Sequence, residues 1–275
     1  MFNSNPLINI MPTKKEIDFF NEQGYLKIKN VVEDEQINDL GKTVLLLCRK
    51  YASDYFHEIS ENNVFANEHF HDCIIKLKAE KPAIFGAIYD SVQCSVSLQS
   101  ILLSKKMLDV ISSITGQPPK FHSLFHSIIR MDVPNDKKNK LSWHQDFVSS
   151  EKVIDHRDGL VSWIPLVKVN SENGSIVVCP TSHNDSNAKN MTVKKRDSGS
   201  NSSEYLDVPI SIIDRYKRTA IEADPGEVVI MPMTLLHQSG MNTSNSVRFT
   251  ALGRYYPMVS EDFLPGRRTY VPSTI

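Results

Sequence analysis

Apolar residues recur along this chain with two different periods, and the change between the two falls near Pro119. Before it, apolar residues return every three or four positions, which is typical of helices with one buried face. The segments with this spacing are 14–22, 36–51 and 82–115. Thr13 is a suitable N-cap for the first helix, Gly24 ends it, and residues 25–29 then alternate like a strand. We therefore predict a helix-rich part over about residues 14–118.

After Pro119, short runs rich in Val, Ile and Phe are separated by turn residues. The runs cover 121–131, 141–148, 160–167, 175–179, 228–233 and 247–256. Many short strands with turns between them predict a β-sandwich or jelly roll. The predicted fold is thus mainly β with flanking helices, and its jelly-roll core spans about residues 119–258. A chain of 275 residues can bury one large core, so we predict a single domain over 1–275.

Residues 184–204 interrupt this pattern, because they are rich in Ser, Asn and Lys and nearly free of core residues. Such a stretch is typical of a mobile surface loop. Long loops in compact domains are also often functional, which would make this segment an active-site lid. The sequence favours neither interpretation over the other.

The composition limits the classes of partner. Apolar residues make up 40% of the chain and charged residues 23%, and the net charge of -1 gives no basic excess to attract nucleic acid or an anionic membrane. The N-terminus lacks the regions of a signal peptide, and no run of about 18 apolar residues is present. The four cysteines form no CxxC pair and lie at Cys48, Cys73, Cys94 and Cys179. We predict a cytoplasmic monomer or homodimer that acts on a small molecule and binds neither nucleic acid nor membrane.

A histidine two residues before a carboxylate can hold a metal, because residues i and i+2 of a strand point the same way. With 9 His and 32 acidic residues, chance predicts roughly one such motif. The chain has three, namely His144-Gln145-Asp146, His156-Arg157-Asp158 and His183-Asn184-Asp185. Bulky residues flank the first, which indicates a strand that reaches a cavity, whereas the sequences around the other two are typical of turns. We therefore favour His144 and Asp146 as a ligand pair.

The third ligand would come from a distant strand, and His237 ends the apolar run 228–236. Two histidines and one carboxylate leave coordination positions open, which suits non-haem iron(II). Taken alone, such a histidine is more often a buried structural residue than a ligand. His69 and His71 form an alternative ligand pair, but their surroundings are polar and helical in pattern.

Arg248 lies inside the apolar strand 247–256, and a buried guanidinium needs a partner. A carboxylate that accepts two parallel hydrogen bonds is the natural one. It could be an Asp or Glu of this chain, or the far carboxylate of 2-oxoglutarate bound to the metal. Both alternatives stay open on the sequence.

Together these motifs resemble the phytanoyl-CoA dioxygenase (PhyH-like) family of Fe(II)/2-oxoglutarate-dependent oxygenases over about residues 16–257. The matching segments are Gly24-Tyr25, Trp143-His144-Gln145-Asp146, Asn173-Gly174, Pro180-Thr181-Ser182-His183, Asp224-Pro225-Gly226-Glu227, and the trio His237, Ser239 and Arg248. The chain departs from the family pattern in having Thr181 for a glycine, Glu227 for an aspartate, and Gln238 where a small residue is usual.

The resemblance implies a double-stranded β-helix, the cupin-like form of the jelly roll. It implies that iron(II) is held by His144, Asp146 and His237. It further implies contacts to 2-oxoglutarate from Arg248, Ser239 and Trp163, with O2 as oxidant and ascorbate as a stimulant of turnover. His126 matches a position that lines the cosubstrate site in relatives, although it could also be a strand histidine facing a polar core.

The implied function is hydroxylation of a C–H bond in a small, biosynthetic or natural-product molecule, with 2-oxoglutarate decarboxylated to succinate. The same centre could instead catalyse desaturation, cyclisation or epimerisation, whereas halogenation is disfavoured because Asp146 is present. Two rival classes remain. One is a non-catalytic jelly-roll binding protein with a relic metal site, and the other is a zinc or manganese cupin that does not use 2-oxoglutarate. The sequence does not identify the substrate or its regiochemistry.

Overall fold

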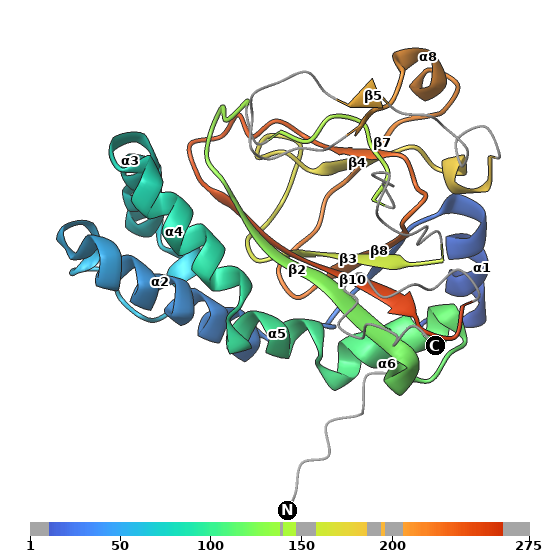
Figure 1. The fold of residues 1–275 in the computed structure, drawn as a ribbon, viewed down its shortest axis with the longest axis horizontal. Helices are drawn as coiled ribbons and strands as arrows, with labels where there is room; N and C mark the ends of the chain where they lie inside the picture. Colours follow the sequence, from blue (N-terminus) through green and yellow to red (C-terminus); the bar gives the residue numbers. More distant parts are fainter. Residues whose placement is uncertain (1–10, 138–139, 147–157, 186–193, 196–205, 261–275) are drawn as a thin grey trace, which may run out of the picture.

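The computed structural model describes residues 11–137, 140–146, 158–185, 194–195 and 206–260 of the chain (Figure 1). In this part of the chain, helices come first and strands follow, as the change of hydrophobic period predicts. None of the helices found there has the length and the apolar character that crossing a membrane would require.

The helical part is α1 (Lys14–Gln23), α2 (Asp34–Phe56), α3 (Glu68–Glu80), α4 (Pro82–Gln93), α5 (Val96–Leu102) and α6 (Lys105–Thr115), with short 3-10 turns η1 (Val64–Ala66) and η2 (Pro119–Phe121). Thr13 caps α1 in a capping box with Glu16, and Gly24 ends the helix at φ 80°, as predicted. The predicted helical stretch 82–115 is three helices, because Ser95 and Ser104 each cap a new one. Helix α3 contains His69 and His71, whose surroundings are helical in pattern, although we predicted no bounds for a helix there.

The strands are β1 (Leu26–Ile28), β2 (His122–Asp132), β3 (Leu160–Pro165), β4 (Ile176–Val178), β5 (Lys194–Lys195), β6 (Leu206–Asp207), β7 (Thr219–Ile221), β8 (Val228–Pro232), β9 (His237–Ser239) and β10 (Arg248–Pro257). The turn η3 (Ser182–Asn184) and the short helix α8 (Ile210–Ile213) lie between strands. The larger sheet has the order β1-β8-β3-β10-β2 and the smaller one β7-β4-β9, and β5 pairs with β6. All of these pairings are antiparallel.

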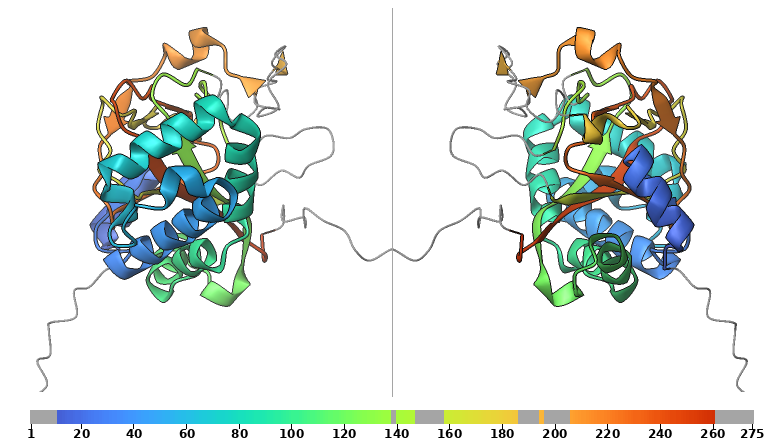
Figure 2. Two further views of the ribbon diagram at one scale, coloured as in Figure 1. Left: turned by 90° about the vertical axis from the view of Figure 1, so that its left-hand side faces the viewer. Right: turned by 90° about the vertical axis from the view of Figure 1, so that its right-hand side faces the viewer.

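The two sheets face each other as the layers of a jelly roll, and helices cover the outer face of the larger sheet (Figure 1). Helices α4 and α5 contact β2, and α2 packs on both helices. In the left view of Figure 2, these helices lie in front of the strands. The prediction of a mainly β jelly roll with flanking helices is confirmed, and in the described residues the sheets do not close into a barrel.

Strand β10 shows how the sheet separates two cores. Phe249, Ala251 and Tyr255 belong to the core under the helices, whereas Leu252 and Tyr256 belong to a second apolar cluster between the sheets. Successive side chains of a strand point to opposite faces. The even-numbered residues of β10 therefore point inward, between the two sheets.

One predicted strand is wrong. Of residues 141–148, the structure describes 141–146, and there His144 forms only an isolated bridge to His237 before the chain turns at Asp146. The chain leaves the ladder because the amide of Asp146 donates to the carbonyl of Met233, in the loop before β9. Most of the predicted loop 184–204, together with His156 and Arg157, lies outside the described residues.

Candidate metal centre

His144, Asp146 and His237 converge between the sheets. One ligand atom from each lies within 4.8 Å of the other two, and the centroids of the two imidazole rings are 4.2 Å apart. Among the residues that the structure describes, this is the group of three His, Cys, Asp or Glu side chains that is arranged to hold a metal ion. The structure thus brings together the three residues that the sequence predicts as ligands.

The backbone positions the two histidines side by side. The amide of His144 donates to the carbonyl of His237 at 2.9 Å, and the amide of His237 donates back at 3.0 Å. Strand β9, which carries His237, is in turn paired with β4, where Val178 lies opposite His237. The ligands are therefore fixed by sheet hydrogen bonds although they are far apart in the sequence.

Each histidine presents the same ring nitrogen to the centre. Nδ1 of His144 lies 2.6 Å from the carbonyl of Ser142, and Nδ1 of His237 lies 3.0 Å from that of Leu235. A carbonyl only accepts, so both Nδ1 atoms carry the proton and both Nε2 atoms keep a lone pair. Burial, together with the neighbouring His237, lowers the pKa of His144 to about 3, so this ring is neutral at physiological pH. Neutral imidazole is the form that binds a metal.

The carboxylate of Asp146 is buried, and one of its two oxygens accepts a hydrogen bond while the other does not. Its side chain is 2% exposed, and Oδ1 accepts a hydrogen bond of 2.6 Å from Nη2 of Arg254. Oδ2 has no hydrogen-bond partner and lies 3.6 Å from Nε2 of His237. Burial alone would raise the pKa of Asp146, but Arg254 and the two histidines outweigh it and hold that pKa well below its usual value. An ionised oxygen without a donor beside two imidazole lone pairs is what a divalent cation requires.

Arg254 is a residue of this site that our sequence reasoning missed. Its side chain is 7% exposed, and it points inward from β10, six residues after Arg248. A signal was present in the sequence, because the apolar strand 247–256 contains a second arginine on the same face as the first. The partner of that second arginine could not be predicted without the fold.

Arg248 has an internal carboxylate as partner, which was one of the two alternatives. Its Nε and Nη2 donate to Oδ2 of Asp132, at 3.2 and 2.7 Å, and Nη1 contacts the carbonyls of Gly174 and Gly240. Asp132 also accepts from Arg130, at 2.6 and 3.1 Å. Asp132 is therefore shared between two guanidinium groups. The positive charges of Arg130 and Arg248 hold the pKa of Asp132 below its usual value, although burial opposes them.

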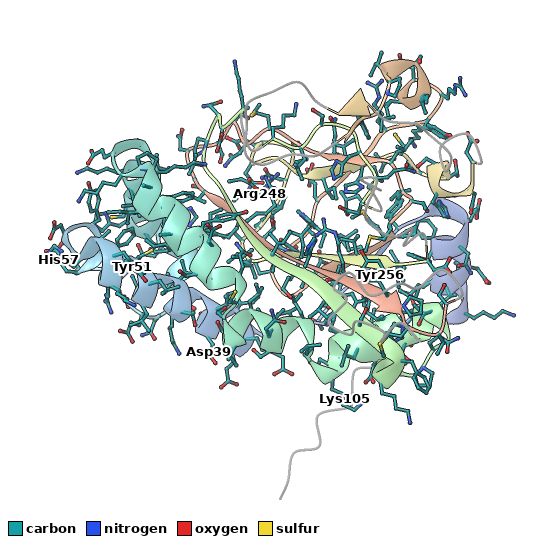
Figure 3. All side chains as sticks on the ribbon, viewed as in Figure 1. Asp39, Tyr51, His57, Lys105, Arg248 and Tyr256 are labelled. Carbon is teal, nitrogen blue, oxygen red and sulfur yellow. The ribbon has the colours of Figure 1, made fainter. Side chains whose placement is uncertain are left out.

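The remaining predicted contacts lie along the same inner surface. Trp163 is buried opposite Leu252 of β10, between the positions of Arg248 and Arg254. Ser239 comes directly before Gly240, whose carbonyl Arg248 contacts. Figure 3 shows Arg248 toward one end of β10 and Tyr256 toward the other.

His126 and Thr250 complete the description of this surface. His126 lies at a bulge of β2, at φ 54°, and partial burial of its ring, followed by the charge of Arg254, lowers its pKa. No pattern in the sequence singles out Thr250. It is fully buried, its hydroxyl has no hydrogen-bond partner, and it pairs in register with Arg130.

The other candidate histidines have structural environments. The ring of His71 bridges two segments, with Nε2 2.7 Å from the carbonyl of Phe65 and Nδ1 accepting from the amide of Val247 at 3.0 Å. His69 is exposed on α3, so the alternative pair of His69 and His71 does not converge. His183 lies 3.0 Å from the carbonyl of Asn21 and is not part of the triad.

Comparison with known proteins places this geometry in a family. The fold is similar to that of the non-heme alpha ketoglutarate dependent carbocyclase SnoK from nogalamycin biosynthesis, with a TM-score of 0.60, 18% identity, and 95% of this chain and 94% of that chain covered. EctD from S. alaskensis, solved with bound Fe, gives a TM-score of 0.60 and 17% identity, covering 96% and 83%. The epimerase SnoN, solved with Fe3+, alpha ketoglutarate and nogalamycin RO, gives 0.54 and 15%, covering 95% and 93%. No curated protein matches the chain.

At the level of sequence, the family model of phytanoyl-CoA dioxygenase (PhyH) matches residues 20–250, which is most of the chain. That range contains the triad, Trp163, Ser239 and Arg248. The chain therefore belongs to the phytanoyl-CoA dioxygenase (PhyH) family of 2-oxoglutarate-dependent, non-haem iron oxygenases.

Proposed function

We propose that this enzyme binds iron(II) through His144, Asp146 and His237 and uses 2-oxoglutarate to hydroxylate a C–H bond of a small molecule. The observation that carries the proposal is Oδ2 of Asp146, which is buried, has no hydrogen-bond partner, and faces Nε2 of His237. A buried carboxylate oxygen without a donor is costly unless a cation lies against it. Two imidazoles and one carboxylate would leave three positions for the cosubstrate and dioxygen.

The inner face of β10 supports binding of a dicarboxylate beside this centre. Arg248 shares Asp132 with Arg130, and its guanidinium would bind the far carboxylate of 2-oxoglutarate, with Ser239 assisting. The unpartnered hydroxyl of Thr250 is available as a further donor. Trp163 would pack along the cosubstrate, and His126 lies where the bulge of β2 opens toward Arg254 and Asp146.

When bound, the iron would supply the oxidative decarboxylation of 2-oxoglutarate to succinate and the oxidation of the substrate. The chain itself would orient the two organic molecules and exclude water. The apolar cluster between the sheets serves the second task, because Trp163, Met231 and Tyr256 are buried there. The guanidinium of Arg248 would serve the first.

A small, biosynthetic molecule is the substrate class we propose. Two of the similar structures are a carbocyclase and an epimerase from nogalamycin biosynthesis, and EctD has been solved with 5-hydroxyectoine. Those proteins share the fold, so cyclisation and epimerisation are the alternative reactions here. These reactions change the mass of the substrate in different ways. Hydroxylation adds one oxygen atom, cyclisation or desaturation removes two hydrogen atoms, and epimerisation leaves the mass unchanged.

Turnover of 2-oxoglutarate tests the proposal. Purified protein with iron(II), ascorbate and O2 should convert 2-oxoglutarate to succinate, slowly alone and faster with a true substrate from a small-molecule panel. The mass of the product then distinguishes hydroxylation from epimerisation and from loss of two hydrogen atoms by cyclisation or desaturation. The control is His237→Ala, which removes one ligand and should abolish succinate formation. Absence of coupled or uncoupled turnover across the panel, with no response to 2-oxoglutarate, would favour a binding protein or another type of cupin.

A further inference from the structure

The ion pair between Arg254 and Asp146 has a feature that a structural salt bridge does not need. Arg254 contacts Oδ1 at 2.6 Å, whereas Oδ2, the oxygen toward the histidines, has no hydrogen-bond partner. Both side chains are nearly inaccessible, at 7% and 2% exposure. The guanidinium therefore divides the carboxylate into one oxygen that is bound by the protein and one that is left for a ligand.

We propose that Arg254 is a positioning residue that makes Asp146 bind the metal through Oδ2 alone. This inference rests on the metal site proposed above. A carboxylate with two unbound oxygens can chelate a metal through both of them. That mode would occupy a position that 2-oxoglutarate or dioxygen needs. A hydrogen bond to Oδ1 prevents it and also holds the Oδ2 atom near the histidines before the metal arrives.

The sheet gives Arg254 a rigid base for this task. Strand β10 is hydrogen-bonded on both sides at this point, with Arg254 opposite Val161 of β3 and Phe125 of β2. The pairing with β2 shifts register between Leu252 and Arg254, where two residues of β2 lie opposite one residue of β10, and bulges of this kind are common beside active sites. Asp146, by contrast, lies in a turn outside the named strands. Arg254, which the sheet holds in place, thus fixes the carboxylate of Asp146.

Arg248 provides a matched control on the same strand and the same face. It is also buried and also paired with an aspartate, but Asp132 is not one of the three ligands. Six residues of strand, roughly 20 Å, separate the two arginines, so their effects should be independent. Loss of Arg254 should weaken binding of the metal, whereas loss of Arg248 should weaken binding of 2-oxoglutarate.

The test compares Arg254→Met, Arg254→Gln and Arg248→Met with the wild type by calorimetric titration of Mn(II) without cosubstrate. We expect Arg254→Met to bind Mn(II) about 10- to 100-fold more weakly, the usual effect of losing a group that orients a metal ligand. Arg254→Gln keeps a neutral donor and should recover part of the affinity. Arg248→Met should bind Mn(II) like the wild type.

A spectroscopic readout separates positioning from loss of structure. At saturating iron(II) without oxygen, the charge-transfer absorption of the iron–2-oxoglutarate complex should shift in wavelength in Arg254→Met, because the binding mode of Asp146 changes. Unchanged Mn(II) affinity in Arg254→Met, or an equal loss in Arg248→Met, would overturn the role of Arg254. A wild-type protein that binds no Mn(II) would instead overturn the metal site itself.

Discussion

At the scale of single residues, Gly174 is the position where backbone and site are most tightly linked. Its φ is +92°, and an added Cβ would lie 2.6 Å from the carbonyl oxygen of Gly240 and 2.7 Å from Nη1 of Arg248. Gly174→Ala should therefore lower the free energy of unfolding by about 2–4 kcal/mol, from backbone strain and displaced contacts. Urea unfolding measures this. Gly86→Ala is the control, since nothing lies within 4 Å of its Cβ, and alanine in α4 should stabilise by about 0.5–1 kcal/mol.

Substitution of Thr250 by valine should not lower the stability of the protein, but it should lower the affinity for 2-oxoglutarate. Thr250→Val removes a buried hydroxyl that has no partner, so stability should stay the same or rise by up to about 1 kcal/mol. If that hydroxyl donates to the far carboxylate of 2-oxoglutarate, affinity for the cosubstrate should fall about 10-fold. Titration of the metal-loaded protein with 2-oxoglutarate checks the second effect. Thr250→Ser keeps the hydroxyl and should bind normally, and equal affinity in the valine variant would remove Thr250 from the site.

How much of the site is predictable differs from residue to residue. His144, Asp146 and His237 could be singled out because ligand chemistry leaves a local motif and a histidine after an apolar strand. Arg254 and Thr250 could not, because a buried arginine or threonine gains a role only from what faces it. The same holds for Arg248, where the sequence shows the need for a carboxylate but Asp132 lies 116 positions earlier.

At the scale of elements, His71 connects α3 to the start of β10 through hydrogen bonds of its ring. Its ring joins the carbonyl of Phe65 to the amide of Val247, and it packs edge-on against Phe249 with ring centroids 5.3 Å apart. His71→Leu would leave both backbone groups without their partner, so we expect a loss of about 2–4 kcal/mol. His69→Leu, at an exposed position of the same helix, should change stability little.

The stability that His71 contributes to the fold should also depend on pH. Burial lowers the pKa of His71 below its usual 6.5, so the unfolded chain takes up a proton at higher pH than the folded one. Stability then rises with pH wherever the unfolded state binds more protons, and it is lost as pH falls below 6.5. The difference in unfolding free energy between wild type and His71→Leu should therefore be smaller at about pH 5 than at about pH 7.5. Urea titrations at both pH values measure it, and a constant difference would contradict the assignment.

Elements with strong local signals were predicted correctly and those held by distant partners were not. Helix α1 has a capping box and a terminal glycine, and the longer strands have apolar runs. Strands β7 and β9 contain no run rich in Val, Ile and Phe, and each pairs with β4, which lies between them. The predicted strand 141–148 is wrong because its pairing with β9 stops after one bridge, which the sequence around it does not show.

At the scale of the whole molecule, pairings between segments that are far apart in the sequence bring the ligands together, as in the bridge between His144 and His237. The order β1-β8-β3-β10-β2 places β8 and β3, which are far apart in sequence, side by side, and no local pattern predicts this. The family resemblance supplied that information in advance, since it implied the jelly roll as a complete arrangement. The periodicity alone indicated strands without saying which of them are neighbours.

Because the ligands come from separate segments, a bound metal should stabilise the whole fold. A ligand that binds only the native state at 100 times its dissociation constant adds about 2.7 kcal/mol, which for a chain of this size is a rise of about 5 °C in Tm. Differential scanning fluorimetry with Mn(II) should show this rise, and a chelator should reverse it. His237→Ala should lose the shift. His183→Ala should keep it, even with a lower starting Tm, because His183 packs against Gly24 rather than the triad. A shift that survives in His237→Ala would place the metal elsewhere in the chain.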